Sequence, residues 1–244
     1  METREGSFKV RTYECGVDGR IRLHTLMQYL QEAASGHAEE LSFGHERMRR
    51  IGGYWALSNM RIEIEELPRW NDEVTIRTWP SGYGRVTATR EFVGIGRSGG
   101  ELFRAGSEWM ILDKARGRPK NLTHLDPGLP GAEVKAIPGQ LKRLQPQAGY
   151  NQGGRINVSY SSIDLNGHVN NTEYVRWGVD ALHRTLKPEG KISGLHVTYL
   201  AEVFEGEGVD VLVCGGGIGR FDVLGRKPEE EINVFMMELC IRDD

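Results

Sequence analysis

The sequence has few cysteines, and their number and spacing exclude several kinds of site. Its 244 residues contain three cysteines, Cys15, Cys214 and Cys240. They are an odd number, lie far apart and form no C-x-x-C pair, so neither a disulfide framework nor a zinc site is expected. The histidines show no metal-ligand spacing either. The run from Gly215 to Gly219 lacks the Lys-Ser/Thr pair of a phosphate-binding loop. We expect a reducing compartment, no metal and no cofactor.

Long apolar runs and a strong net charge are also absent. Nowhere do about 18 apolar residues run together, and the first residues form no apolar signal segment, so we expect a cytoplasmic protein without a membrane partner. The net charge of −3 gives no electrostatic case for binding nucleic acid. A hydrophobic content of 39% can form one large core or two smaller ones.

The first half reads as one long helix and a group of strands. Apolar residues recur at three and four residue steps from Leu23 to Leu41, which predicts a helix with one broad apolar face. His37 lies on this face, and we expect it to be packed and hydrogen-bonded to the backbone. Alternation predicts an initial strand and four more that form an antiparallel meander: Phe8–Tyr13, Trp55–Ile64, Val74–Thr78, Arg85–Gly94 and Glu101–Asp113.

The second half repeats this pattern. Adding 135 to the numbers of Ile62, Ile64, Val74 and Ile76 gives Val197, Tyr199, Val209 and Val211 without a gap. The predicted helix and strands are Asn170–Leu186, Arg155–Ser161, Gly194–Val203, Val209–Cys214 and Ile232–Ile241. We therefore predict an α+β fold of two tandem domains, 1–125 and 151–244, joined by a proline-containing linker, 126–150. In each domain an antiparallel sheet wraps a long helix, which is the layout called a hot dog.

A cluster of polar residues precedes the second helix. Asp164, Asn166 and His168 place an acid, an amide and an imidazole around Gly167, and Asn170 with Glu173 three residues later forms a variant of the capping box. Such residues can serve catalysis. They can also be ordinary turn and cap residues, and the stretch alone leaves both interpretations open.

Several segments together resemble one enzyme family. The stretch Ser162–Trp177 resembles the D-x-N-x-H motif and following helix of the acyl-ACP thioesterases, and Tyr29–Ala34, Trp55–Trp79 and Ser107–Asp113 resemble segments of their first half. The resemblance covers nearly the whole chain. It implies hydrolysis of acyl-[acyl carrier protein] at the end of fatty-acid synthesis, with the acylated carrier protein as partner. Nothing before Phe8 is long enough for the transit peptide of plant members, so we expect a bacterial or trimmed member.

The resemblance also implies which residues act. It assigns catalysis to Asp164, Asn166, His168 and Glu202, the last expected in the strand after the helix. Many plant members have a cysteine directly after this glutamate, where this chain has Val203, so a cysteine mechanism is excluded. Thioester hydrolysis needs an activated nucleophile and oxyanion donors. The backbone at Gly167 could donate, and either carboxylate could act as base or nucleophile.

The first half lacks this motif, since Gly16–Arg20 offers an acid without the amide or imidazole. We expect one active site per chain, with the first domain as the acyl-chain pocket, as the family implies. Aromatic and thioether side chains that could line this pocket, or simply form core, are Met27, Trp55, Met60 and Trp109. Basic residues that could dock an acidic carrier protein, or simply face solvent, are Arg116, Arg118, Lys120 and Arg176.

Three other functions remain compatible with the sequence. An acyl-CoA thioesterase of the same fold would perform the same reaction on another carrier. Some hot-dog enzymes are hydratases or dehydratases, and a non-catalytic acyl-binding protein is the third alternative. The sequence leaves open the acyl chain length and whether the tandem unit forms a homodimer.

Overall fold

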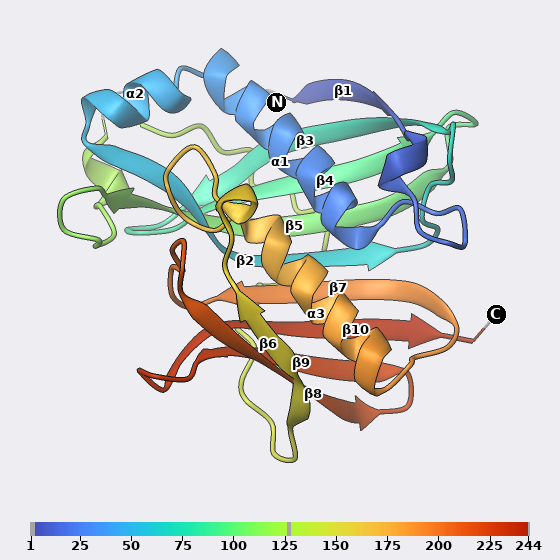
Figure 1. Ribbon diagram of the computed structural model, residues 1–244. Coiled ribbons are helices and arrows are strands. Elements are labelled where there is room, and N and C mark those ends of the chain that lie inside the picture. Colours follow the sequence, from blue (N-terminus) through green and yellow to red (C-terminus); the bar gives the residue numbers. More distant parts are fainter. Residues whose placement is uncertain (1–2, 126–127, 244) are drawn as a thin grey trace. The chain divides into compact units, whose positions relative to one another are not determined.

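The chain forms two compact units, Met1–Leu141 and Lys142–Asp244, each with a long helix and an antiparallel sheet (Figure 1). The computed structural model describes residues 3–125 and 128–243. This arrangement confirms the predicted α+β fold with a repeated unit. The division falls inside the segment 126–150, which the sequence predicts as a linker. The first two residues of that segment lie outside the described residues. The domain boundaries themselves stay a prediction.

The first unit is a sheet of five strands beside one long helix. Its strands lie in the order β1-β3-β4-β5-β2, and each neighbouring pair is antiparallel. The helix α1 (Leu23–Glu40) buries Leu26, Leu30 and Ala33, as its apolar spacing predicts. The other elements are β1 (Arg4–Lys9), α2 (His45–Arg50), β2 (Gly53–Ile64), β3 (Glu73–Tyr83), β4 (Ala88–Gly96) and β5 (Glu101–Asp113).

The second unit has the same topology. Its strand order, read from β6, is β6-β8-β9-β10-β7, which matches the first unit strand for strand. Ile76 in β3 and Val211 in β8 are both almost fully buried, as the repeat predicts. The elements are β6 (Asn151–Asn157), α3 (Asn171–Thr185), β7 (Lys191–Tyr199), β8 (Gly208–Gly217), β9 (Arg220–Lys227) and β10 (Ile232–Arg242).

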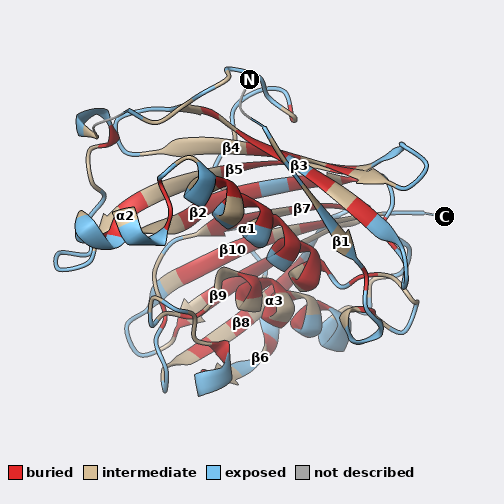
Figure 2. Ribbon diagram, turned by 90° about the horizontal axis from the view of Figure 1, so that it is seen from above, coloured by how far each residue is buried: buried red, intermediate tan, exposed pale blue. Residues whose placement is uncertain are grey.

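The helices and strands of each unit share a core. Figure 2 shows buried residues along the inner face of each helix and the middle of the strands. In α3 these are Tyr174, Val175 and Leu182, each at most 3% exposed. Full burial of one such apolar side chain is worth about 1.5–3 kcal/mol. No helix in the described ranges is long and apolar enough to cross a membrane.

Some predicted boundaries are wrong. The first strand of each unit ends early, at Lys9 and at Asn157, and the chain then forms short 3-10 turns at Thr12–Glu14 and Tyr160–Ser162. In the first unit, Lys9 pairs with the first residue of β3, so the alternating residues beyond it have no partner strand. Two further elements were not predicted. The helix α2 is too short to show a period, and charged residues mask the alternation of β9.

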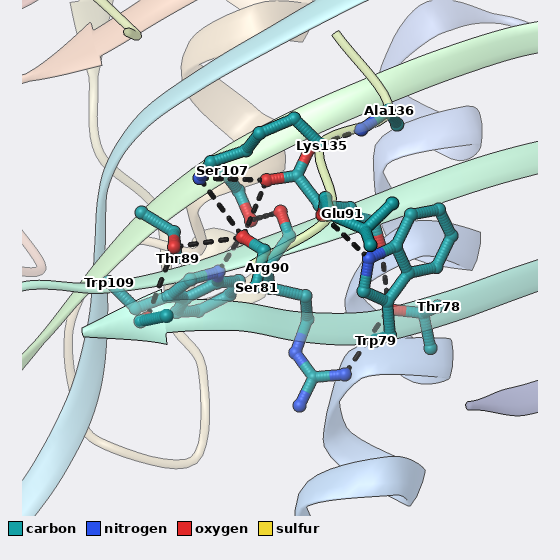
Figure 3. Close-up of polar contacts among 12 residues, drawn as sticks. Thr78, Trp79, Ser81, Thr89, Arg90, Glu91, Ser107, Trp109, Lys135 and Ala136 are labelled. Carbon is teal, nitrogen blue, oxygen red and sulfur yellow. Dashed lines mark hydrogen bonds and ion pairs between the residues drawn. The ribbon is translucent and has the colours of Figure 1, made fainter. Parts of the chain in front are cut away.

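A buried carboxylate holds the segment after Gly131 against the sheet of the first unit. Glu91 on β4 is 2% exposed. Its carboxylate accepts hydrogen bonds from Ser81 Oγ at 2.7 Å and from the Ala136 backbone at 3.1 Å, and it pairs with Lys135 at 3.1 Å (Figure 3). Removing the acid would take this shared acceptor away. The Ala136 N–H would then have no acceptor, while Ser81 Oγ keeps its contact with Thr89 Oγ1 and Lys135 keeps its bond to Ser81 Oγ.

We therefore predict that Glu91→Ala lowers the free energy of unfolding by about 2–4 kcal/mol, because it removes the buried acceptor that Ser81, Lys135 and Ala136 share. The matched control is Glu63→Ala, which breaks only the exposed pair with Arg61 and should cost under about 1 kcal/mol. Urea denaturation of both variants measures this difference. Equal losses would show that the Glu91 network contributes no more than a surface ion pair.

Candidate active site

The segment before α3 is a tight turn closed by its own backbone. The Asp164 N–H donates to the His168 carbonyl at 2.8 Å, and the Gly167 N–H donates to the Asp164 carbonyl at 3.0 Å. Gly167 has a φ of +86°, a conformation that a side chain would strain. Nothing lies within 4 Å of the position its Cβ would take, so the glycine is needed for backbone conformation rather than space.

The Asp164 side chain reinforces this turn. Its Oδ1 accepts from the Asn166 N–H at 2.7 Å and more weakly from the His168 N–H at 3.4 Å. The turn role that the sequence left open is therefore present. The second oxygen, Oδ2, accepts no hydrogen bond from the described part of the chain. One oxygen of Asp164 shapes the loop, and the other remains for a substrate or water.

His168 and Glu202 come together from two separate segments. His168 Nδ1 lies 3.2 Å from Glu202 Oε1, and the two side chains are 19% and 35% exposed. The Val169 N–H donates to the Val203 carbonyl at 2.9 Å, which fastens the segments side by side. The prediction that Glu202 lies in a strand is wrong, because β7 ends at Tyr199. Glu202 instead lies in the following connection, where it is half-buried.

The pairing determines what the imidazole can do. A neutral ring whose Nδ1–H donates to Glu202 carries its lone pair on Nε2, and that nitrogen is then the basic one. The carboxylate also stabilises the ring once it has taken up a proton. Phe204 packs edge-on against the imidazole, with ring centroids 5.0 Å apart, and further restricts it. The arrangement suits His168 to general-base work.

Phe204 was not among the predicted site residues, although the repeat in the sequence points to it. The Phe204 N–H donates to Glu207 Oε2 at 2.8 Å, and in the first unit the Arg69 N–H donates to Asp72 Oδ2 at the same distance. The two pairs are related by the same shift of 135 residues that aligns the strands. Extending that alignment past the strand end would have identified the turn that carries Phe204.

Backbone N–H groups around Gly167 are occupied, whereas the N–H of Asn171, the first residue of α3, makes no hydrogen bond within the described residues. The N–H groups of Gly167, Val169 and Asn170 donate to carbonyls within the protein, so the predicted role of the Gly167 backbone is not supported. The reason is that these N–H groups are used in the hydrogen bonds that close the turn and hold it to its neighbours. The Asn166 side-chain amide makes no hydrogen bond to the described residues and can donate to a carbonyl instead.

The start of α3 is capped, but not by the predicted box. Asn170 is the N-cap, and its Oδ1 accepts from the Thr172 N–H at 3.0 Å. Glu173 does not return to the N-cap backbone. Its carboxylate accepts from Ser162 Oγ at 3.0 Å and forms an ion pair with Arg176. Glu173 therefore ties the helix to the residue before the turn.

The first unit contains the same turn without the same side chains. The Gly16 N–H donates to the Arg20 carbonyl at 2.8 Å, the Gly19 N–H donates to the Gly16 carbonyl at 3.0 Å, and Gly19 has a φ of +74°. The Ile21 N–H donates to the Pro68 carbonyl at 2.8 Å, as Val169 does to Val203 in the second unit. Gly16 and Arg20 take the places of Asp164 and His168.

The first-unit position that corresponds to Glu202 is apolar. Subtracting 135 gives Leu67, which is 7% exposed. Asp18 takes the place of Asn166 in the same turn, so the acid, the amide and the imidazole are all replaced while the backbone turn is kept. The first unit serves as an internal comparison that separates the turn's structure from its chemistry.

An apolar cleft lies in the first unit beside α1. The space counted within and in front of it, open solvent at its mouth included, is about 610 Å³. Trp55 and Trp109, both predicted pocket residues, line it together with Ala34 of α1. The other two predicted residues, Met27 and Met60, are each 2% exposed and form core away from this cleft. Their predicted pocket role gains no support from this cleft, because sequence alone does not distinguish a buried core position on an apolar helix face from a pocket wall.

The predicted docking residues differ in their surroundings. Arg116 and Arg118 are exposed in the turn after β5. Lys120 pairs with Asp113 at 2.6 Å, and Arg176 pairs with Glu173. The first two arginines therefore present the accessible positive charge, whereas the charges of the other two are partly offset. Within the described residues, no group of three or more His, Cys, Asp or Glu side chains could hold a metal ion.

Comparisons with known proteins agree with this architecture. The model of the acyl-ACP thioesterase N-terminal domain matches residues 2–124, and the model of the acyl-ACP thioesterase C-terminal domain matches residues 148–242. Two solved structures have the same fold over almost the full length. An acyl-ACP thioesterase from Bacteroides thetaiotaomicron has a TM-score of 0.82 at 22% identity, covering 98% of both chains. A 12:0-ACP thioesterase from Umbellularia californica has a TM-score of 0.84 at 21% identity, covering 99% of this chain and 98% of its own.

Two curated relatives from plants are similar over most of this chain. An oleoyl-acyl carrier protein thioesterase from Arabidopsis thaliana is 27% identical over 228 residues, which are 84% of this chain and 61% of that protein. An acyl-[acyl-carrier-protein] hydrolase from Cuphea viscosissima is 26% identical over 210 residues, 80% of this chain and 50% of its own length. This chain therefore spans about half to three fifths of these relatives. With both domain models matched in order, the chain belongs to the acyl-ACP thioesterase family.

Proposed function

We propose that this protein hydrolyses the thioester of acyl-[acyl carrier protein] and releases a free fatty acid, a step that ends fatty-acid synthesis. The observation that carries the proposal is the His168–Glu202 pair beside the turn closed by Asp164, in a chain of this family. The names of the plant relatives support the reaction and the carrier. The free thiols Cys15, Cys214 and Cys240 suit the cytoplasm as the place of action.

In the proposed reaction His168 Nε2 takes a proton from water as the water oxygen attacks the thioester carbonyl. Glu202 stabilises the imidazolium through Nδ1–H. The Asn166 amide donates to the carbonyl oxygen as it becomes negative. The C–S bond then breaks, and the imidazolium returns the proton to the thiolate. The products are a carboxylic acid and the carrier-protein thiol. Asp164 keeps the turn in shape and places a negative charge beside the reacting groups.

The two units divide the work in this proposal. The second unit carries the reacting groups, and the apolar cleft of the first unit binds the acyl chain. Its lining of tryptophan, alanine, leucine and proline side chains suits a hydrocarbon chain, since such a chain gains free energy by leaving water. Binding and chemistry can then be altered separately by substitution.

We predict that Asp164→Asn or His168→Ala lowers kcat/KM on acyl-[acyl carrier protein] by about two orders of magnitude or more, with folding intact. Asparagine keeps an Oδ1 that can accept the hydrogen bonds of the turn's N–H groups. Asp164→Asn therefore removes the negative charge and keeps the shape of the turn. The matched control is Asp18→Asn in the first-unit turn, whose Oδ1 accepts from the Arg20 N–H at 3.1 Å. A wild-type rate for either site variant would refute the site assignment.

Enlarging a small residue in the cleft should change chain-length preference. Ala34 lines the cleft from α1, so Ala34→Phe fills space that a long acyl chain would need. We expect kcat/KM to fall for long acyl groups and to be kept for short ones, measured on a series of acyl-[acyl carrier proteins]. An equal loss at every length would instead indicate damage from overpacking.

Docking of the acidic carrier protein should depend on the exposed arginines after β5. Arg116→Glu with Arg118→Glu is expected to lower kcat/KM for acyl-[acyl carrier protein] at low salt, since like charges slow association. The effect should fade near 1 M salt, where the Debye length is about 3 Å. A small thioester without the carrier protein provides the control. If its hydrolysis falls equally, these arginines support the fold or site and do not dock the carrier.

A further inference from the structure

One cation lines the apolar cleft of the first unit. Arg90 on β4 extends toward α1, whereas its neighbour Glu91 extends to the opposite side of the strand (Figure 3). Its Nη1 donates to His37 Nδ1 at 3.0 Å and to Thr78 Oγ1 at 3.2 Å. Nε and Nη2 make no hydrogen bond within the described parts of the chain, and neither atom is sealed from solvent.

No acidic group compensates this charge among the described residues. Arg90 forms no ion pair there, and burial alone lowers its pKa to about 10. The guanidinium stays charged at neutral pH nonetheless. Leaving a charge in an apolar site is costly unless a partner or water satisfies it. The cleft therefore contains a positive group with two unused donor nitrogens.

His37 does not supply the missing negative charge. Arginine can only donate, so His37 Nδ1 is the acceptor and the ring carries its proton on Nε2. Burial, together with the charge of Arg90, lowers the pKa of His37 to about 4, so the ring is neutral at pH 7. The expectation that His37 is bonded to backbone is thereby corrected. Its partner is the Arg90 side chain, and it holds the guanidinium in place.

Binding of a plain hydrocarbon chain in this cleft does not require a cation. The cleft's other lining residues include Ala34, Ala38, Leu41, Phe43, Trp55 and Trp109, which suit a plain hydrocarbon chain. A guanidinium among them would be left without its hydrogen bonds when an unsubstituted acyl chain displaces water. An acyl chain with an oxygen acceptor at that place would restore them.

We infer that Arg90 selects acyl chains that carry an oxygen function away from the thioester, a carboxylate most strongly and a hydroxyl less. The inference rests on the proposed function and on the first-unit cleft as the acyl site. A carboxylate can accept from Nε and Nη2 together in the paired geometry that arginine favours, and it also neutralises the charge. A hydroxyl would accept from only one of them.

The test compares acyl-[acyl carrier proteins] of equal length that end in a methyl, a hydroxyl or a carboxylate, at several lengths. With Arg90→Met, we expect kcat/KM to fall about tenfold or more for the carboxylate-ended chain and to hold or rise for the methyl-ended chain. Arg90→Lys should recover part of the loss, because it keeps the charge without the planar fork. Arg85→Met, at an exposed arginine, is the matched control.

Binding without turnover provides a second measurement. Trp55 and Trp109 line the cleft, so their fluorescence reports its occupation. The probes are the monomethyl ester of an α,ω-dicarboxylic acid and the methyl ester of the matching fatty acid. Wild type should prefer the first and Arg90→Met the second. An unchanged preference in Arg90→Met, in binding or in kcat/KM, would overturn the inference even if the wild type hydrolyses every substrate.

The two proposals fail differently. If the wild type hydrolyses no acyl-[acyl carrier protein], the proposed function is wrong, and the fluorescence preference still decides the role of Arg90. If the wild type hydrolyses methyl-ended chains and Arg90→Met alters all chains alike, the proposed function stands and the selection by Arg90 is wrong.

Discussion

Each half of this protein depends on covering the apolar face of one helix with an antiparallel sheet. α1 and α3 bury their apolar residues, and neither helix could do so in water alone. The strands that cover them follow the same order in both units. This constraint fixes where each helix begins, and hence where the turn before it lies. The position of the candidate site follows from the start of α3, because the turn that carries the site leads directly into this helix.

The two turns show how one backbone can carry different chemistry. Both are closed by backbone hydrogen bonds and a glycine in the left-handed conformation, so their shape does not depend on the acid or the imidazole. Gly16, Arg20 and Leu67 stand where the second unit has Asp164, His168 and Glu202. A duplicated scaffold could therefore hold a reactive group in one unit and a binding cleft in the other without changing the fold.

Much of the fold was predictable because its signals are periodic. The long helices and the central strands are long enough to show their periods, and the shift of 135 residues revealed the repeat. The ends of the strands were not predictable, because they depend on where the partner strand stops. Two strands end at Lys9 and Asn157 although the alternation in the sequence continues. The site residues Asp164, His168 and Glu202 came from the resemblance. The resemblance did not predict the contacts between them, because the His168–Glu202 pair joins two segments that only folding brings together.

The surroundings of buried polar groups were the least predictable feature. Arg90 looked like one residue of an alternating strand, and His37 like a packed core histidine. Their mutual contact is a tertiary one, and nothing local in the sequence encodes it. The Gly167 backbone illustrates the reverse case, in which a sequence pattern suggested free donors that the folded turn consumes.

The most direct test of the central claim is the wild-type protein on matched acyl-[acyl carrier protein], acyl-CoA and enoyl-[acyl carrier protein], with free thiol and hydrated product measured in parallel. We predict thiol release that is fastest from acyl-[acyl carrier protein], with no hydration of the enoyl chain. Faster release from acyl-CoA would show that the carrier is wrong. Hydration without thiol release, or binding without turnover, would contradict the proposed reaction itself.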